Sequence, residues 1–569
     1  VEYYNLRIRK INVDGVNVTK TASDDLYVQN QIWANDTCTV IDMDGHDLYT
    51  EGNLRLASQV NGYPPQVQWG GGRYIHEGGN VTLDEDVIEY NTIIKRGDSW
   101  MDFSVDITVA GDVTISDESN LDMNQYMMEC TGTGKTFTLG ANSRLYSYIA
   151  DTIAGDTTYA FPIGFATYTI KESSLYYLRG DQDQAILPGV TYGNVYLNDN
   201  VTKTVSLFGD LDVEGDFRVN NDGIVLNDQG YDLYLSGYDN DLRNYSPTST
   251  IYFDSDTEQR LFAGGNFDEV YLNNVEFSGG GGTMQLIYES DYYINGDFRI
   301  TENDSVYSND NIIFQGDSMC ITGYFEHVAN TFTFNGEDQI INPGTGMFHD
   351  VVFNKSGVKL FKENGINIDG DITIVGEFVD APDPDPDYYD TVTVQFDTLV
   401  HYIASEDIVV QSNSTWDTDS ADIYFDRAGT QYIPKIELNN VFFANRGTKY
   451  LTDTLWANDI TIQDNVRFRS SDNSDNPNDI FCYGSWTNNG ASNLYENEVY
   501  FESRNTDSKT IKTNNDDFFK VFFNQLNTST RTYTLTDNLQ VDDELVIGDG
   551  ATLKTGDNNL QLGDNDPNE

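Results

Sequence analysis

A five-residue motif that recurs along the chain constrains the fold more than any other feature. It consists of a small or polar residue, Asp, an apolar residue, any residue and a second apolar residue. Successive copies are 74 to 104 residues apart. Self-similarity of this kind is the sequence signature of a repeat architecture. The copies begin at Gly111, Gly215, Gly296, Gly370 and Asn458, and a degenerate copy spans 542–546.

A second motif precedes the first in each of the last five units. It is an aromatic strand, a polar turn in which Gln stands before an apolar residue, and another aromatic strand. The glutamine is absent from the fifth copy, which has Lys509-Thr510-Ile511 in its place. Each unit is therefore a series of short strands separated by turn residues. The glutamines are Gln184, Gln259, Gln339 and Gln431.

Period-2 alternation within these segments indicates β-strands, as in Asp371-Ile372-Thr373-Ile374. We predict an all-β fold, an elongated β-solenoid of tandem repeats that resembles a parallel β-helix, with roughly 20–25 residues per coil. Tandem β-sandwich beads are the alternative. No boundary between units resembles a linker, which favours the solenoid. The proline-rich stretch 382–387 cannot join a central strand, so we expect it to form an exposed loop.

The apolar positions of the first motif should all point into the core. The residues are Val113, Ile115, Phe217, Val219, Phe298, Ile300, Ile372, Ile374, Ile460 and Ile462.

The motifs divide the chain into a divergent N-terminal β region and five repeats. The first 170 residues fit the repeat less well, and Phe161-Pro162-Ile163-Gly164 interrupts their strand pattern. This region is either solenoid with larger insertions or a distinct β domain that leads into it. The predicted divisions are 1–170 (N-terminal region), 171–249, 250–330, 331–421, 422–497 and 498–569, the last repeat including a polar tail.

The charge balance is strongly acidic, with 92 acidic and 32 basic residues and a net charge of −60. Such a surface repels nucleic acid and anionic membranes, because phosphate binding needs clustered Lys and Arg. Two explanations stay open: a solvated acidic surface suited to salty water, or carboxylates that bind Ca²⁺. The sequence requires no cofactor and leaves calcium as a candidate, although each acidic turn also fits an Asx turn. The candidate calcium ligands are Asp222, Asp472, Asp475 and Asp557.

No catalytic signature appears in the sequence. It contains no nucleophile elbow, phosphate loop, dinucleotide fingerprint or HExxH motif. A glycosidase would need two nearby carboxylates, and among 92 acids the sequence cannot select a pair. We therefore predict that the chain is not an enzyme. The cysteines Cys38, Cys130, Cys320 and Cys482 form no CxxC pair, so we expect isolated buried thiols.

The motifs together resemble a known class of repeats. A strand, a Gln-apolar turn, a Tyr-x-Asn-apolar strand and Gly-Asp-apolar-x-apolar, over roughly 100–562, are similar to repeats of very large surface proteins of Bacteroidota. Those proteins are exported by the type IX secretion system and include gliding adhesins. The resemblance implies an extracellular location at the bacterial cell surface, and this chain is then a processed protein or a piece of a larger one.

A triplet of Asp, Ser or Thr, and an apolar residue or Thr is similar to the O-glycosylation motif of the same bacteria. The alternative is an ordinary β-turn, in which Asp and Thr are common. The glycosylation sites that the resemblance implies are Thr152, Thr157, Ser305, Ser318, Thr391, Thr398 and Thr454.

These observations lead to one functional prediction and two alternatives. We predict a non-catalytic structural or adhesive segment of an extended surface protein or filament. Its expected partners are other surface proteins, extracellular polysaccharide or a substratum; nucleic acid is not expected, nor membrane insertion by this segment. The alternatives are a carbohydrate-active β-helix enzyme and a carbohydrate-binding module. Distinctive residues that recur along the chain favour the structural role, because each repeat mainly contacts its neighbours and adds length.

Overall fold

The structure is a computed structural model, and within its described residues every regular element is a β-strand. The described chain makes about 21 turns of a parallel β-solenoid. This confirms the predicted fold, and the sandwich alternative is wrong. The described residues are 2–8, 18–34, 39–51, 54–55, 66–83, 89–150, 152–153, 156–198, 202–220, 224–242, 248–262, 269–286, 291–362, 365–375, 378–379, 388–389, 391–396, 400–410, 414–418, 421–471, 478–504, 507–524 and 530–563.

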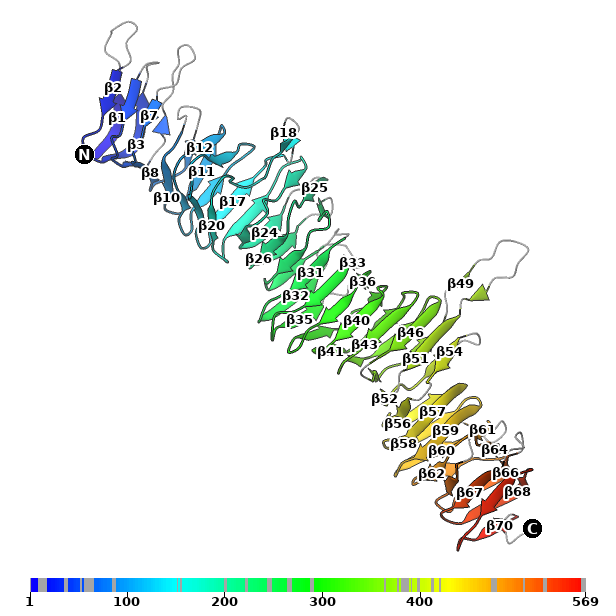
Figure 1. The fold of residues 1–569 in the computed structure, drawn as a ribbon. Helices are drawn as coiled ribbons and strands as arrows, with labels where there is room; N and C mark the ends of the chain where they lie inside the picture. Colours follow the sequence, from blue (N-terminus) through cyan, green and yellow to red (C-terminus); the bar gives the residue numbers. More distant parts are fainter. Residues whose placement is uncertain are drawn as a thin grey trace. The chain divides into compact units, whose positions relative to one another are not determined.

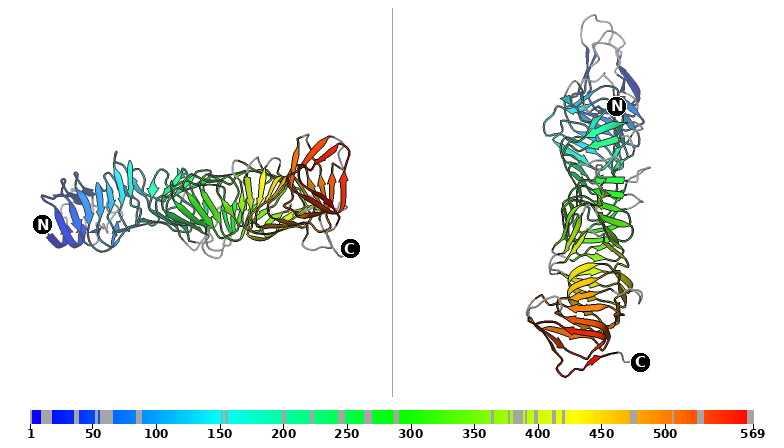
Figure 2. Two further views of the ribbon diagram at one scale, coloured as in Figure 1. Left: turned by 90° about the horizontal axis from the view of Figure 1, so that it is seen from below. Right: turned by 90° about the vertical axis from the view of Figure 1, so that its right-hand side faces the viewer.

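The coil arises because short strands alternate with tight turns, and each strand pairs in parallel with the strand one coil further along. β10 (Thr92–Lys95), for example, pairs with β13 (Val113–Ile115), which pairs with β16 (Thr136–Leu139). Side-chain contacts between neighbouring coils commonly join residues 18 to 26 positions apart, and the separation is larger where a coil carries an insertion, as between Asp371 and Asp407. The expected coil length was therefore close to the observed one. Up to three strands in each coil build sheets around a central core, and the ribbons of Figures 1 and 2 show these strands stacked along each unit.

The contacts divide the chain into two units, Val1–Asn274 and Val275–Glu569. In unit 1 the first sheet contains, in two stretches, β1 (Glu2–Ile8), β3 (Leu26–Ala34), β5 (Leu48–Thr50), β8 (Arg73–His76), β10, β13, β16 and β20 (Thr167–Ile170), then β23 (Thr191–Tyr192), β26 (Leu211–Val213), β29 (Leu233–Leu235) and β31 (Thr250–Phe253). The second sheet contains β9 (Val81–Leu83), β11 (Trp100–Phe103), β14 (Asn120–Asp122), β17 (Arg144–Ser147), β21 (Leu175–Leu178), β24 (Asn194–Leu197), β27 (Phe217–Val219), β30 (Asp239–Asp241) and β32 (Glu258–Phe262). The third face is assembled from β2 (Val18–Thr21), β4 (Thr39–Asp42) and β7 (Gln66–Gln68), then β12 (Ile107–Val109) and β15 (Met128–Cys130), then β22 (Gln184–Ala185), β25 (Lys203–Ser206) and β28 (Ile224–Asn227).

Unit 2 repeats this plan. Its first sheet contains β34 (Asn274–Phe277), β37 (Phe298–Ile300), β40 (Ser318–Ile321), β43 (Gln339–Asn342), β46 (Gly357–Phe361), β51 (Val392–Phe396) and β54 (Thr415–Asp417). The third contains β36 (Asp291–Ile294), β39 (Ile312–Phe314), β42 (Thr331–Phe334), β45 (Asp350–Phe353), β48 (Ile372–Ile374) and β53 (Ile408–Val410), and a further sheet holds β56 (Gly429–Ile433), β58 (Gly447–Leu451), β60 (Val466–Arg469) and β63 (Ala491–Asn493). The second contains β35 (Thr283–Leu286), β38 (Ser305–Ser308), β41 (Tyr324–His327), β44 (Met347–Phe348), β47 (Asn367–Ile368), β52 (Val400–Ile403), β55 (Asp422–Phe425), β57 (Ile436–Phe443), β59 (Leu455–Ile462), β61 (Ile480–Cys482), β62 (Trp486–Asn488), β64 (Glu498–Phe501), β65 (Lys509–Lys512), β66 (Asp517–Phe523), β67 (Arg531–Leu535), β68 (Leu539–Ile547), β69 (Ala551–Lys554) and β70 (Leu560–Leu562).

The core is filled by the inward positions of these strands. All ten apolar residues predicted to point inward are at most 1% exposed, which confirms that assignment. Outward positions alternate with them, as in β48, where Thr373 is half-buried between Ile372 and Ile374. Full burial of one such side chain contributes about 1.5–3 kcal/mol, so the inward rows hold the coils together.

The five complete copies of the first motif do not lie on one face. They fall in β13 and β37 of the first sheets, β27 and β59 of the second sheets, and β48 of the third. The structural period is therefore the single coil, and the motif marks a corner before a strand on any of the three sheets. The longer units at 171–249, 250–330, 331–421, 422–497 and 498–569 stay a prediction.

The N-terminal region belongs to the solenoid, as the first of its two alternatives stated. Ile163, in the segment expected to interrupt the strands, exchanges backbone hydrogen bonds with Met128 and Cys130 of the preceding coil. The described departures from parallel pairing are two antiparallel pairs. One joins β18 (Thr152–Ile153) and β19 (Asp156–Thr157), and the other joins β49 (Phe378–Val379) and β50 (Tyr388–Tyr389). β49 stands away from the coils in Figure 1, and the proline-rich stretch 382–387 lies outside the described residues.

Candidate functional site

The aspartate of the first motif joins neighbouring coils. In four copies its Oδ1 accepts a hydrogen bond from a backbone N–H one coil further along, at 2.6 to 3.2 Å. The glycine before it is needed because the preceding coil approaches closely: a Cβ on Gly111 would lie 2.1 Å from the carbonyl oxygen of Asn91. A share of the acidic residues is therefore structural. The pairs are Asp112 with Thr136, Asp216 with Asp239, Asp371 with Asp407 and Asp459 with Ser485.

The glutamine of the second motif also joins neighbouring coils, from the inside of the coil. All four glutamine side chains are buried, and each Nε2 donates to backbone carbonyl oxygens of the preceding coil. A buried amide satisfies carbonyl groups at a corner where the strand ladder is interrupted. The acceptors are Ser147 and Ile149 for Gln184, Leu235 and Gly237 for Gln259, Phe314 and Gly316 for Gln339, and Ile403 for Gln431.

Of the four buried lysines among the described residues, three lie at comparable corners: Lys95, Lys359 and Lys449. The ammonium of Lys449 donates to Arg427 O at 2.7 Å and to Gln431 Oε1 at 3.0 Å, and that of Lys359 donates to Gly336 O and Glu337 O, both at 2.6 Å. Lys95 donates to Ser99 Oγ at 2.6 Å. Burial lowers the pKa of each lysine to about 8. These lysines donate hydrogen bonds to backbone carbonyl oxygens and lie in the interior of the solenoid. Their lowered pKa values therefore reflect a structural role rather than a catalytic one.

Outward aromatic side chains form stacks that run from coil to coil. Tyr146 and Tyr177 have ring centroids 4.6 Å apart and planes within 4°. Tyr424 and Phe442 stack at 4.3 Å and 6°. A ring inside such a stack has its faces covered by its neighbours and presents only its edge. The rings inside these stacks therefore stabilise the solenoid and offer no flat platform to a sugar ring.

One pair of carboxylates differs from the corner aspartates. Asp102 and Asp122 lie opposite each other in neighbouring strands β11 and β14, on the outer face of the second sheet. Burial raises the pKa of both, the charge of Asp122 raises the pKa of Asp102 further, and the Asn124 N–H and Arg179 oppose the rise at Asp122. Like charges in direct register are unfavourable. Sequence analysis missed this pair; an Asp between apolar residues, as in Met101-Asp102-Phe103, was the available signal.

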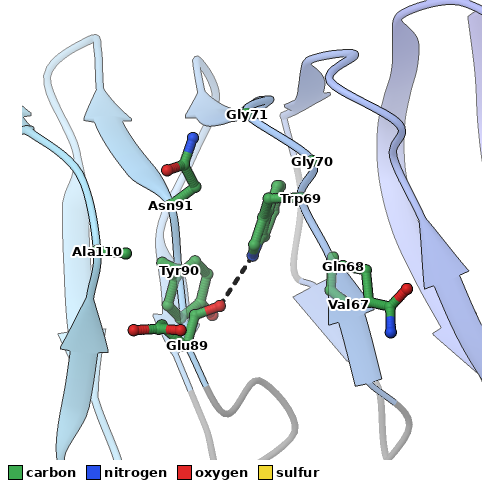
Figure 3. A pocket seen from close by; sticks show the side chains of 9 residues that line it. All are labelled: Val67, Gln68, Trp69, Gly70, Gly71, Glu89, Tyr90, Asn91 and Ala110. Carbon is green, nitrogen blue, oxygen red and sulfur yellow. Dashed lines mark hydrogen bonds between the residues drawn. The ribbon is translucent and has the colours of Figure 1, made fainter. Parts of the chain in front are cut away.

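A pocket of about 410 Å³ lies on the third face of unit 1 (Figure 3). Trp69 and Tyr90 line it, with ring centroids 5.9 Å apart. The indole Nε1 of Trp69 donates to the carbonyl oxygen of Glu89 at 2.9 Å. The polar group that a ligand would engage is thus already bonded within the protein.

A second pocket of unit 1, about 420 Å³, is lined by acids of the first sheet. Asp212 accepts from Thr191 Oγ1 at 2.6 Å, Asp210 accepts from the Asp232 N–H at 3.1 Å, and Asp254 accepts from Ser236 Oγ at 2.5 Å. Each carboxylate therefore has a donor from the protein.

Only one of the four predicted calcium ligands lies among the described residues. Asp557 is exposed in the turn between β69 and β70, whereas Asp222, Asp472 and Asp475 lie outside the described residues. A different group, Asp24, Asp25 and His46, brings one ligand atom of each residue within 4.8 Å of the others. Asp25 Oδ1 also accepts the backbone N–H of Asp47 at 2.9 Å, so it already has a structural role. The calcium sites stay a prediction.

The predicted glycosylation sites differ in accessibility. Thr391 is exposed, and Ser305, Ser318 and Thr454 are half-buried. Thr398 lies outside the described residues, and for Thr152 and Thr157 only the backbone, in β18 and β19, is described. Glycosylation stays a prediction, and Thr391 is the most accessible of the four sites whose side chains are described.

The described cysteines are free thiols. Cys130 and Cys482 are buried, as expected, whereas Cys320 is partly exposed, which differs from the expectation, and Cys38 lies outside the described residues. Burial raises the pKa of Cys482 to about 12, which makes it unreactive at neutral pH. Among the described residues there is no helix long and apolar enough to cross a membrane.

Comparison of the chain with protein-family models, with curated proteins and with solved structures finds no match in any of the three. The resemblance to type IX-secreted repeats therefore stays a prediction.

Proposed function

We propose that this chain is a non-catalytic, structural and adhesive segment of an extended protein at the bacterial cell surface. One observation carries the proposal: the residues that recur along the sequence contact a neighbouring coil rather than converge on one site. The motif aspartates accept hydrogen bonds from backbone amides, the motif glutamines donate hydrogen bonds to backbone carbonyl groups, and the outward aromatic rings stack on each other. A solenoid built in this way adds length with each coil.

The acidic coat fits this role. Side chains with a net charge of −60 repel neighbouring copies of the chain and keep a long repeat protein in solution. The proposed partners are other surface proteins, extracellular polysaccharide or a substratum.

In this role the solenoid acts as a spacer that adds length to the protein. Removal of whole coils tests the spacer role. Deletion of 312–371 joins Asn311 to Ile372, which occupies the place of Ile312 in the third sheet; it removes the coils of β39, β42 and β45 and keeps β48. A spacer keeps its fold and its display at the cell surface after this deletion. Cell-surface labelling with an antibody to the chain measures display, and circular dichroism of the purified variant measures the fold. Deletion of 312–361 is the matched control. It joins residues that are out of strand register, so this variant should unfold.

A second function has one observation in its favour. Asp102 and Asp122 form an opposed pair of carboxylates on neighbouring strands, which lie about 4.8 Å apart, and both pKa values are raised. Retaining glycosidases place their two carboxyl groups about 5–5.5 Å apart. Incubation of the chain with neutral and acidic polysaccharides, with and without Ca²⁺, tests this role. Cleavage that Asp122→Asn abolishes would replace the structural proposal with an enzyme.

A further inference from the structure

A third pocket, of about 340 Å³, lies on three successive coils of unit 2. Ser414 and Trp416 come from the coil of β54, Lys435 and Glu437 from the coil of β57, and Trp456 from β59. Glu437 and Trp456 are partners in the parallel register, so they lie side by side on the outer surface. The volume is within the range of small-ligand sites.

The pocket contains polar groups that the protein leaves unpaired. Trp416 is 5% exposed, its ring stacks on Phe396 at 5.2 Å, and its Nε1 has no hydrogen-bond partner among the described residues. The Oγ of Ser414 is likewise buried and unpartnered. Trp69, by contrast, bonds its indole N–H to a backbone carbonyl. Buried donors normally have an acceptor, and these two unpaired donors lie at one pocket, where a ligand can supply it.

Trp456 adds an aromatic surface beside these donors. One face of its indole stacks on Phe481, with centroids 5.8 Å apart and planes within 11°. The ammonium of Lys435 lies 5.3 Å from the ring centroid. Trp456 is the first ring of its stack, so one of its faces has no aromatic neighbour among the described residues, and the ammonium of Lys435 lies over the ring.

The charges at the pocket favour an anion. Glu437 is the only carboxylate among the residues that line it, and it pairs with Arg504 at 2.7 Å. No carboxylate of the described residues lies within ion-pair distance of Lys435. Charges of the acidic coat beyond about 8 Å are largely screened at physiological ionic strength, so the local cations determine what binds.

We propose that this pocket binds an acidic sugar unit, a uronate, of an extracellular polysaccharide. The apolar face of the sugar ring packs on Trp456, its carboxylate pairs with Lys435, and its oxygens accept from Ser414 and Trp416. A uronate combines a flat C–H face with oxygens that accept hydrogen bonds, which matches a site that has an indole face and an excess of donors. The proposal rests on the adhesive role proposed above and names its ligand class.

Binding of hexagalacturonate to the intact chain, with cellohexaose as the neutral probe, tests the site. The chain has six tryptophans, so ¹⁵N labelling of tryptophan yields six indole N–H signals, and Trp416→Phe assigns one of them. We expect hexagalacturonate to shift the signals of Trp416 and Trp456 and to leave that of Trp69 unchanged. Lys435 is exposed, so Lys435→Gln should keep the fold and weaken binding about ten-fold.

The controls separate this site from the general function. Lys554→Gln, an exposed lysine on β69 outside the pocket, should bind like the wild type. No binding of hexagalacturonate at millimolar concentration, equal binding of cellohexaose, or unchanged binding by Lys435→Gln would each overturn the proposal. None of these results bears on the spacer role, which the coil deletion tests separately.

Discussion

The buried lysines should make this solenoid more stable as the pH rises above 8. Lys449 is fully buried, and burial lowers its pKa from 10.5 to about 8. Below pH 8 the folded and unfolded chains both hold this proton. Between pH 8 and 10.5 the folded chain has lost it while the unfolded chain keeps it. The free energy of unfolding therefore rises with pH in this window.

The magnitude follows from the size of the shift. For one lysine with these two pKa values, the gain between pH 8 and pH 9.5 is about 1.5 kcal/mol. Lys95 and Lys359, with pKa values also near 8, contribute in the same direction. Above pH 10 the tyrosines act the other way, because burial raises the pKa of Tyr533 to about 12 and the folded chain then keeps a proton that the unfolded chain loses.

The test compares the wild type with Lys449→Met. Urea unfolding followed by far-ultraviolet circular dichroism at pH 8 and pH 9.5 measures the rise in each protein. We expect the variant to lose about 1.5 kcal/mol of that rise, whatever its stability at pH 8. Lys554→Met, at an exposed position, is the control and should rise like the wild type. An equal rise in wild type and Lys449→Met would show that the ammonium is not held in a low-dielectric corner.

Three further predictions test the coil-to-coil contacts. Ile374→Asp places a charge in the core and should cost several kcal/mol, whereas Thr373→Asp on the outer face should cost under about 1 kcal/mol; similar melting of the two would contradict the inward assignment. Asp112→Ala removes the acceptor of the Thr136 N–H and should cost about 1 kcal/mol, and Asp112→Asn, which keeps an oxygen, should recover most of it; equal unfolding free energies of the two variants would exclude the hydrogen bond. Gln339→Leu leaves Gly316 O without its side-chain donor and should cost about 1–3 kcal/mol in urea unfolding, and a variant as stable as the wild type would show that water replaces the amide.

Much of the site could not be predicted because its residues are distant in sequence. Trp416, Lys435 and Trp456 meet only because they occupy successive coils, and no short motif contains them. Asp102 and Asp122 likewise face each other through the register of β11 and β14. The strand register depends on loop lengths in each coil, which vary, so sequence spacing does not show which outward residues become neighbours.

The sequence by itself determined the fold class and the inward rows. Period-2 alternation decides which residues face the core, since successive side chains on a strand point to opposite sides, and Ile372 and Ile374 are buried as their alternation required. The tertiary structure alone decided on which sheet each copy of a motif lies. Corner aspartates such as Asp216 and buried glutamines such as Gln259 recur on different sheets, so their spacing along the chain exceeds one coil. The physical reason is that a hydrogen bond between coils needs two backbones close together in space. Stacking of the coils brings them together, and separation along the sequence does not show which residues then meet.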